Sequence, residues 1–336
     1  MARLCHHFGM PTRAVLLVIA VAGILPAQLP EFYKKVDRVT WIVPDLDKTA
    51  AAWRKAGIET IVERGELSVE VSFRGRIVKA RWRAANARIG DLWWDWVQPV
   101  SDDDAFAEFL RASGGGVMAL MHRAPTLGAF NAEIERLRAL GVLPLQLGEL
   151  GPVRFAYFDT RAEGKYVLGL QYMEQGEPDP PAPGPIRITQ FAFVAKDFDA
   201  VSAYWEKLGF PKMAVNNSRP SNARYRGAPV DLEMDLGWHR HGKIPYEWAR
   251  PIKGPSTYED HIKAHGEGFH HFGVGVDDMD AAIARWESLG YKVAQSGGWG
   301  ETGKPGSGRF AYIDTDPIGG ALIELLWNYR APAGKK

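Results

Sequence analysis

The sequence repeats itself at a nearly constant spacing, and this repeat limits the folds that the chain can adopt. The stretch RFAYFDT at residues 154–160 returns as RFAYIDT at residues 309–315, 155 positions later. Other landmarks recur 152 positions apart: Asp45 and Asp197, Gly57 and Gly209, Pro99 and Pro251, Gly114 and Gly266, Gly116 and Gly268. One spacing shared by so many landmarks indicates an internal duplication, so we predict two halves built on the same plan.

A shorter repeat lies within each half. Residues 45–57, 197–209 and 278–290 each begin with Asp and end with Gly twelve positions later. An Asp before an amphipathic segment is typical of a helix N-cap, and a Gly after it is typical of a C-terminal cap. Strand-like runs flank these segments, for example at residues 39–43 and 190–195. We therefore expect four copies of a strand–helix–strands unit, two in each half.

Length and composition fit two soluble globular domains. The chain has 336 residues and a net charge of +1, and it contains no long basic run, so we expect no nucleic-acid partner. Cys5 is the only cysteine, which excludes a disulfide framework and a thiolate metal site. Proline is dense at residues 176–186, so we interpret this stretch as a linker between a domain at 34–175 and a domain at 187–330.

The N-terminus has the pattern of a leader. Residues 14–25 are almost all apolar, follow Arg13, and end at Pro26-Ala27-Gln28. This run is too short to span a bilayer but fits the apolar region of a secretory signal. We therefore expect residues 1–28 to be a signal peptide or a disordered leader, with no membrane span in the mature chain. A signal peptide implies export; an unprocessed leader implies a cytoplasmic protein.

Three ionisable residues stand in strongly apolar strands near the C-terminus. His270 and His271 lie in FHHFGVGV, and strict strand alternation predicts that their side chains point to opposite faces. Glu324 lies in the apolar run GGALIELL. An unpaired buried glutamate costs several kcal/mol, so Glu324 needs a partner, either an arginine or a metal ion. A lone buried histidine is usually a core residue, but His271 together with Glu324 suggests a pair of metal ligands.

These segments are similar to the vicinal oxygen chelate superfamily, which includes glyoxalase I, methylmalonyl-CoA epimerase, extradiol dioxygenases and bleomycin-resistance proteins. The resemblance is carried by residues 269–278, 319–326 and 247–251, and by 258–268, and it extends over residues 36–328. It implies an α+β fold of four βαβββ modules, paired into two domains whose curled mixed β-sheets surround a metal cavity. In this family the ligands come from the first and last strands of each module.

Position by position, the resemblance implies a metal site in the second half only. The implied ligands are Gln190, Glu247, His271 and Glu324, a plausible set for one divalent ion such as Zn, Ni, Co, Mn or Fe. The corresponding positions of the first half carry Arg38, Asp95, Ala119 and Gly169. Because arginine, alanine and glycine cannot bind a cation here, we expect the first domain to be degenerate and metal-free.

The resemblance leaves three functions open. The first is a metal-dependent lyase or isomerase of glyoxalase or epimerase type, in which Glu324 or Glu247 moves a proton beside a metal-bound carbonyl of a small substrate. The second is an extradiol-type dioxygenase, although its two-histidine, one-carboxylate face would place a histidine at Gln190. The third is a non-catalytic binder of bleomycin-resistance type. The sequence is compatible with a monomer or a homodimer.

Other polar and aromatic clusters have simpler interpretations. His239 and His241 share a strand face but lie in a dense polar segment, which favours a solvent-exposed turn. An arginine cluster can contact an anionic substrate, but a solvated loop is the simpler expectation for it. Tryptophans around Asp95 suggest packing between modules. The residues of these two groups are Arg219, Arg224 and Arg226, and Trp93, Trp94 and Trp96.

Overall fold

The computed structural model describes residues 28–175 and 186–330. The predicted leader and the predicted linker lie outside these residues, apart from positions 28 and 186 at their edges. Among the helices of the described part, none is long and apolar enough to cross a membrane.

The first half contains two modules that share one order of strands and helices. Strand, helix and three strands follow one another in each, and a short 3-10 helix, η1 (Glu31–Lys34), precedes the first module. The first module consists of β1 (Arg38–Ile42), α1 (Leu46–Lys55), β2 (Val62–Phe73), β3 (Arg76–Ile89) and β4 (Leu92–Pro99). After α2 (Ala105–Ser113), the second consists of β5 (Gly116–Arg123), α3 (Leu127–Ala139), β6 (Pro144–Leu150), β7 (Val153–Phe158) and β8 (Val167–Met173), with α4 (Arg161–Gly164) before β8.

The second half follows the same order with one inserted hairpin. Its first module consists of β9 (Ile188–Val194), α5 (Phe198–Lys207), β10 (Ala214–Ser218), the inserted β11 (Ser221–Tyr225) and β12 (Ala228–Pro229), β13 (Glu233–His239) and β14 (Tyr246–Lys253). After α6 (Thr257–His265), its second module consists of β15 (Gly268–Gly275), α7 (Met279–Ser288), β16 (Val293–Trp299), β17 (Gly308–Ile313), η2 (Asp316–Ile318) and β18 (Leu322–Asn328). The predicted aspartates Asp45, Asp197 and Asp278 each cap a helix through a side-chain oxygen.

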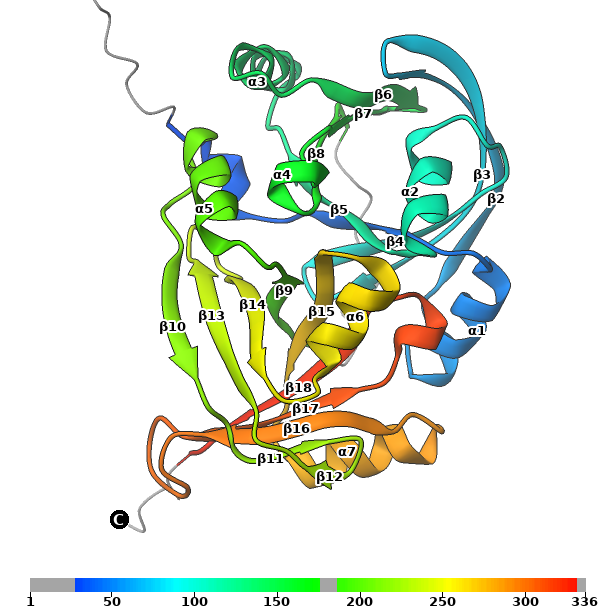
Figure 1. Ribbon diagram of the computed structural model, residues 1–336. Helices are drawn as coiled ribbons and strands as arrows, with labels where there is room; N and C mark the ends of the chain where they lie inside the picture. The colour runs from blue at the N-terminus through cyan, green and yellow to red at the C-terminus, as the bar shows by residue number, and fades with distance from the viewer. Residues whose placement is uncertain (1–27, 176–185, 331–336) are drawn as a thin grey trace, which may run out of the picture.

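The two halves form two separate sheets, one closed and one open. The first is a closed barrel in the order β1-β4-β3-β2-β6-β7-β8-β5, and the second is a ten-stranded sheet in the order β10-β13-β14-β9-β15-β18-β17-β16-β11-β12. Figure 1 shows the barrel above the open sheet. The barrel closes where β2 pairs with β6. In the second half the inserted β11 pairs with β16 instead, and the sheet does not close.

An aromatic core joins the halves. Trp41 and Trp94 from the barrel pack on Phe272 of β15, with ring centroids 5.4 and 4.8 Å apart. Trp41 also donates a hydrogen bond to the Gly319 carbonyl at 2.5 Å. A Cβ atom at Gly319 would lie 2.9 Å from the Trp41 indole nitrogen, so glycine is required at this contact. The tryptophans near Asp95 thus serve packing between modules, as the sequence suggested.

The α+β fold with curled mixed sheets agrees with the prediction, but some elements were missed. Neither α2 nor α6 nor the β11–β12 hairpin was predicted, and β2 and β3 are longer than the predicted runs at residues 68–73 and 77–82. In the missed part of β2, residues 62–67, nearly all side chains are exposed, so no period-two signal marks it. In β3, burial does alternate over residues 84–89, and the predicted run stopped short of this part.

Candidate metal centre

Four neighbouring strands of the open sheet carry the four predicted site residues. Glu247 lies on β14, Gln190 on β9, His271 on β15 and Glu324 on β18, and these strands are adjacent in the sheet. β9 and β15 are antiparallel, and each pairs in parallel with its outer neighbour. The first strand of each module therefore meets the last strand of the same module, which brings residues distant in sequence together.

Three of these residues converge on one point. The His271 Nε2 atom lies 3.1 Å from Glu324 Oε2 and 3.4 Å from Glu247 Oε2. All three side chains are at least nine-tenths buried. One ligand atom from each lies within 4.8 Å of the other two, which is the arrangement of a mononuclear cation site. The predicted convergence of Glu247, His271 and Glu324 is therefore present.

A hydrogen-bonded pair of histidines fixes the orientation of the His271 ring. His270 Nε2 lies 3.2 Å from the Thr257 carbonyl, and His270 Nδ1 lies 2.7 Å from His271 Nδ1. Because a carbonyl only accepts, His270 Nε2 carries its proton and His270 Nδ1 is an acceptor. His271 Nδ1 is then the donor, and His271 Nε2 faces the two carboxylates.

The prediction that His270 and His271 point to opposite faces is wrong. The pairing of β15 with β9 shifts register between Phe269 and His271, which marks a β-bulge. A bulge interrupts strict alternation, so both rings turn to one side of the strand. His270 is fully buried behind His271, and both rings contact Tyr312.

Two buried carboxylates and one imidazole share this point. Neither His271 Nε2 nor Glu324 Oε2 has a hydrogen-bond partner, although both atoms are buried. Burial disfavours the imidazolium, but the two carboxylates outweigh burial and raise the pKa of His271 to about 9. Burial also raises the pKa of Glu247, and the charge of Glu324 adds to this. With a proton alone the cluster keeps one net negative charge, whereas a divalent ion neutralises both carboxylates. One imidazole and two carboxylates therefore fit a divalent metal ion.

Gln190 lies beside this centre but in a different role from the predicted one. Its Nε2 atom donates to Glu247 Oε2 at 2.9 Å. A Cβ atom at Gly273 would lie 2.7 Å from Gln190 Oε1, so glycine at 273 leaves room for the amide. As it lies, Gln190 holds Glu247 in place and does not offer its oxygen to the same point. Its role as a ligand remains a prediction.

A cavity of about 580 Å³ opens directly onto the centre. Its wall includes Gln190, Glu247 and Glu324. The hydroxyls of Tyr258 and Tyr312, which also line it, are 2.8 Å apart. This volume suits a small organic molecule.

Two exposed arginines, Arg187 and Arg240, line the same cavity. Neither forms an ion pair with a carboxylate of the described residues. The guanidinium of Arg240 lies 4.5 Å from the centroid of the Trp238 ring. Neither arginine could be predicted as a cavity residue, because nothing in their local sequence distinguishes them from other surface arginines.

The other polar clusters of the second half lie away from the centre. Arg219 pairs with Glu233 at 2.9 Å, and Arg226 pairs with Asp260 at 2.9 Å, so the simpler expectation of surface roles agrees with their contacts. The expectation of an exposed turn is wrong for His239. Its side chain is buried because Trp248 packs over β13 and donates to His239 Nδ1 at 3.3 Å.

In the barrel, the matching positions hold a different arrangement. One guanidinium nitrogen of Arg38 lies 2.9 and 2.8 Å from the two carboxylate oxygens of Asp95. Ala119 and Gly169 take the places of His271 and Glu324, and the strand registers agree with this correspondence. A Cβ atom at Gly169 would lie 2.0 Å from the sulfur of Met121, so Met121 fills the space of the missing carboxylate. No cation site of this kind exists among the described residues of the barrel.

Comparison with known proteins agrees with this architecture. Residues 189–312 match the sequence profile described as the Glyoxalase/Bleomycin resistance protein/Dioxygenase superfamily. Residues 189–312 therefore belong to this vicinal oxygen chelate superfamily, and the predicted resemblance is confirmed for them. No curated protein matches the chain in sequence.

Solved structures with related folds share little sequence with the chain. A triple mutant of 4-hydroxymandelate synthase from Streptomyces coelicolor is similar with a TM-score of 0.60 and 13% identity, over 90% of this chain and 94% of that one. BphC, a halotolerant catechol dioxygenase, is similar with a TM-score of 0.46 and 14% identity, over 88% of this chain and 87% of that one. Methylmalonyl-CoA epimerase from Mycobacterium tuberculosis is similar with a TM-score of 0.31 and 19% identity, over 41% of this chain and 87% of that one. At these identities the first similarity supports the fold alone.

Proposed function

We propose that the protein is a divalent-metal-dependent enzyme of glyoxalase or epimerase type, which moves a proton next to a carbonyl group of a small substrate. Glu247, His271 and Glu324 would hold the ion. When bound there, a divalent metal supplies a Lewis acid that polarises a substrate carbonyl. The observation that carries this proposal is the buried convergence of His271 Nε2 with Glu324 Oε2 at 3.1 Å and with Glu247 Oε2 at 3.4 Å.

The contacts of the two carboxylates suggest separate roles for them. Glu247 is fixed by the amide of Gln190, whereas Glu324 Oε2 accepts no hydrogen bond from any described residue. A carboxylate without such a partner is the freer of the two to approach a substrate. We assign to Glu324 the removal of a proton from the carbon next to the carbonyl, and to either carboxylate its return to that carbon or to the neighbouring one.

The cavity suggests the class of substrate. Arg187 and Arg240 lie in its exposed part, and Glu247 and Glu324 lie in its buried wall. A small molecule that carries a carbonyl at one end and a negatively charged group at the other matches this distribution. Guanidinium groups are well suited to carboxylate or phosphate recognition.

The test combines metal analysis with a turnover screen. Purified protein is analysed for bound metal and then incubated without oxygen with acidic hydroxy-ketones and thiohemiacetals in deuterated water. The proposal expects about one equivalent of metal at this centre, exchange of a substrate carbon-bound proton for deuterium, and loss of exchange after chelation. Full exchange after complete removal of metal would contradict it.

A ring-cleaving or other oxygen-dependent activity is the second candidate, and the description of the matched profile, which includes dioxygenases, favours it. The side chains at the centre argue against it, since they supply one histidine and two carboxylates rather than two histidines and one carboxylate. Oxygen consumption with a catechol or a keto acid, dependent on added Fe²⁺, would replace the first proposal with this one. A protein that retains no metal and turns over nothing would instead be a small-molecule binder.

A further inference from the structure

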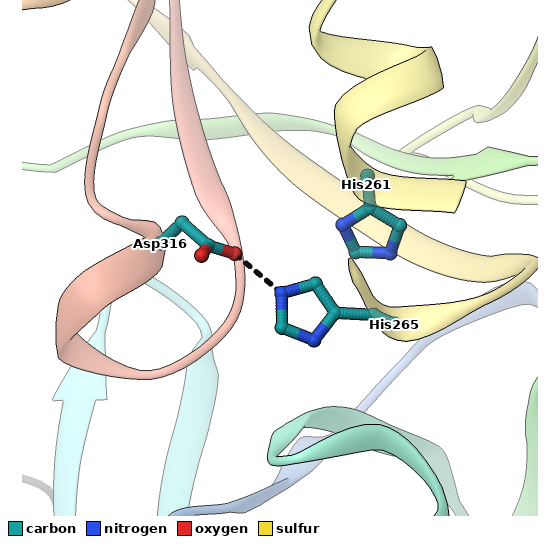
Figure 2. A group of neighbouring side chains, drawn as sticks. All are labelled: His261, His265 and Asp316. Atoms are coloured by element: carbon teal, nitrogen blue, oxygen red, sulfur yellow. Dashed lines mark hydrogen bonds and ion pairs between the residues drawn. The ribbon is translucent and has the colours of Figure 1, made fainter. Parts of the chain in front are cut away.

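A second group of metal-binding side chains lies at the junction of the two halves. His261 and His265 are four residues apart on α6, so helical geometry places them on one face. Asp316, the first residue of η2, faces them from the neighbouring segment (Figure 2). One ligand atom of each residue lies within 4.8 Å of the other two.

The hydrogen bonds of His265 direct one of its nitrogens into this cluster. His265 Nδ1 lies 2.7 Å from the Ser113 carbonyl, which only accepts, so this nitrogen carries a proton. His265 Nε2 lies 2.8 Å from Asp316 Oδ1. A partner carbonyl on the far nitrogen is the usual arrangement behind a metal-bound histidine.

His261 completes the set. Its side chain is 7% exposed, and its ring centroid lies 4.9 Å from that of His265. Neither ring nitrogen makes a hydrogen bond with another described residue. Neither nitrogen is among the fully enclosed atoms without a partner, so both can be reached by water or by a metal ion.

The surroundings leave room for an ion and a path to it. A cavity of about 20 Å³ lies against His261 and His265, though not against Asp316, and its volume is close to that of one small probe sphere. The side chain of Asp316 is 40% exposed, so an ion and its remaining water ligands can reach the cluster from solvent. Two cationic side chains on the cavity wall have partners on the same wall: Lys165 pairs with Glu267 at 3.3 Å, and Arg161 lies over the ring of Phe109.

The matching positions of the barrel carry no histidine and no carboxylate. The positions that match His261, His265 and Asp316 at the same sequence offsets are occupied by Phe109, Ser113 and Arg161. Arg161 stacks over Phe109 at 4.6 Å and donates to the Ser113 hydroxyl at 2.5 Å. A permanent cation, the guanidinium, thus stands where the second half has a carboxylate.

From this geometry we propose that His261, His265 and Asp316 form a second site for a divalent first-row transition-metal ion, separate from the Glu247–His271–Glu324 centre. Two imidazoles, one carboxylate and water form a typical ligand set for Zn²⁺. His270 lies between the two sites, with its ring 5.1 Å from that of His261. The ion would tie α6 to η2 beside the Ser113 carbonyl of the barrel.

The test is a calorimetric Zn²⁺ titration of the full-length, metal-stripped protein and its variants. Wild type is expected to bind two equivalents. Asp316→Asn and His261→Phe, which keep the size of the side chains, are each expected to bind one, as is Glu324→Gln. Asp280→Asn, an exposed carboxylate on α7, is the matched control and is expected to bind two. Circular dichroism verifies that each variant is folded.

The variants that lose an equivalent of Zn²⁺ show which of the two sites binds the ion. If wild type binds one equivalent of Zn²⁺, and this equivalent is lost in Glu324→Gln but kept in Asp316→Asn and His261→Phe, the second site is overturned. The proposed function is then left intact. A single equivalent lost in Asp316→Asn and retained in Glu324→Gln would support the second site and contradict the metal centre of the proposed function.

Discussion

Each half of the chain has a carboxylate at the same position of its sheet, but the two halves place different charges around it. Both place a carboxylate on the last strand of their first module, Asp95 in the barrel and Glu247 in the open sheet. In the barrel Arg38 neutralises the carboxylate with a built-in cation. In the open sheet the matching residue is the neutral Gln190, and Glu324 adds a second negative charge. The difference teaches that one scaffold can bury a carboxylate stably or hold it ready for an external cation.

The two halves also differ in where a large and a small residue lie on paired strands. At the paired positions of β5 and β8 the barrel has Met121 opposite Gly169, whereas β15 and β18 have Gly273 opposite Glu324. The large residue lies on the first strand of the module in the barrel and on the last strand in the open sheet, and the small residue lies on the other strand in each case. The barrel uses the volume for an apolar sulfur in a closed core, and the open sheet uses it for a carboxylate at the wall of a cavity. Closure of the sheet and loss of the charged site thus go together.

The largest expected effect is the loss of activity on neutralising the extra carboxylate. Glu324→Gln should lower turnover by about 10³-fold, the range of a lost general base, and should remove metal from the centre. The matched change in the barrel, Asp95→Asn, should leave turnover unchanged. Steady-state kinetics with metal analysis of both variants measures this. Equal losses in the two variants would show that the halves do not differ in function.

The second prediction concerns the stability of the barrel. Arg38→Met leaves Asp95 without its guanidinium at a position where both side chains are less than one-fifth exposed. The free energy of unfolding should fall by about 2–4 kcal/mol, since an unpaired, mostly buried carboxylate remains. Urea denaturation gives the value. The double variant with Asp95→Leu is the control, and it should recover most of the loss; no recovery would mean that packing of Arg38, rather than its charge, matters.

The third prediction tests the histidine pair. Position 118 of the barrel, which matches His270, is a methionine. His270→Met removes the acceptor of the His271 Nδ1 proton and should weaken metal binding at the centre by about 10- to 100-fold. Competition with a chelator of known affinity measures the change. An unaltered affinity would show that the ring of His271 is held by Tyr312 and its other neighbours alone.

The smallest expected effect belongs to Gln190. Gln190→Ala removes the hydrogen bond that holds Glu247 and should lower turnover about tenfold, because a hydrogen bond to a charged group contributes about 1.5 kcal/mol. Gln171→Ala, which removes an amide bound to Asp37 in the barrel, is the matched control and should not change turnover. If Gln190→Ala instead loses its metal completely, the amide oxygen is a ligand, as the sequence predicted.

The sequence was informative where periodicity and pairing act locally, and less so where strands are irregular. The helix caps and the convergence of Glu247, His271 and Glu324 followed from the repeat and the resemblance. The orientation of His270 did not, because a β-bulge has no reliable sequence signal and reverses strict alternation. Nor did the cluster of His261, His265 and Asp316, since it depends on α6 and η2 meeting beside Ser113 of the barrel. Burial of His239 depends in the same way on a neighbouring strand.

The most direct test of the central claim is anomalous X-ray diffraction from crystals of the protein soaked in Co²⁺, recorded on both sides of the cobalt absorption edge. The account predicts an anomalous peak within coordination distance of His271 Nε2 and the carboxylates of Glu247 and Glu324, and none beside Arg38 and Asp95. A map without density between these three side chains, or with an equal peak in the barrel, would contradict it.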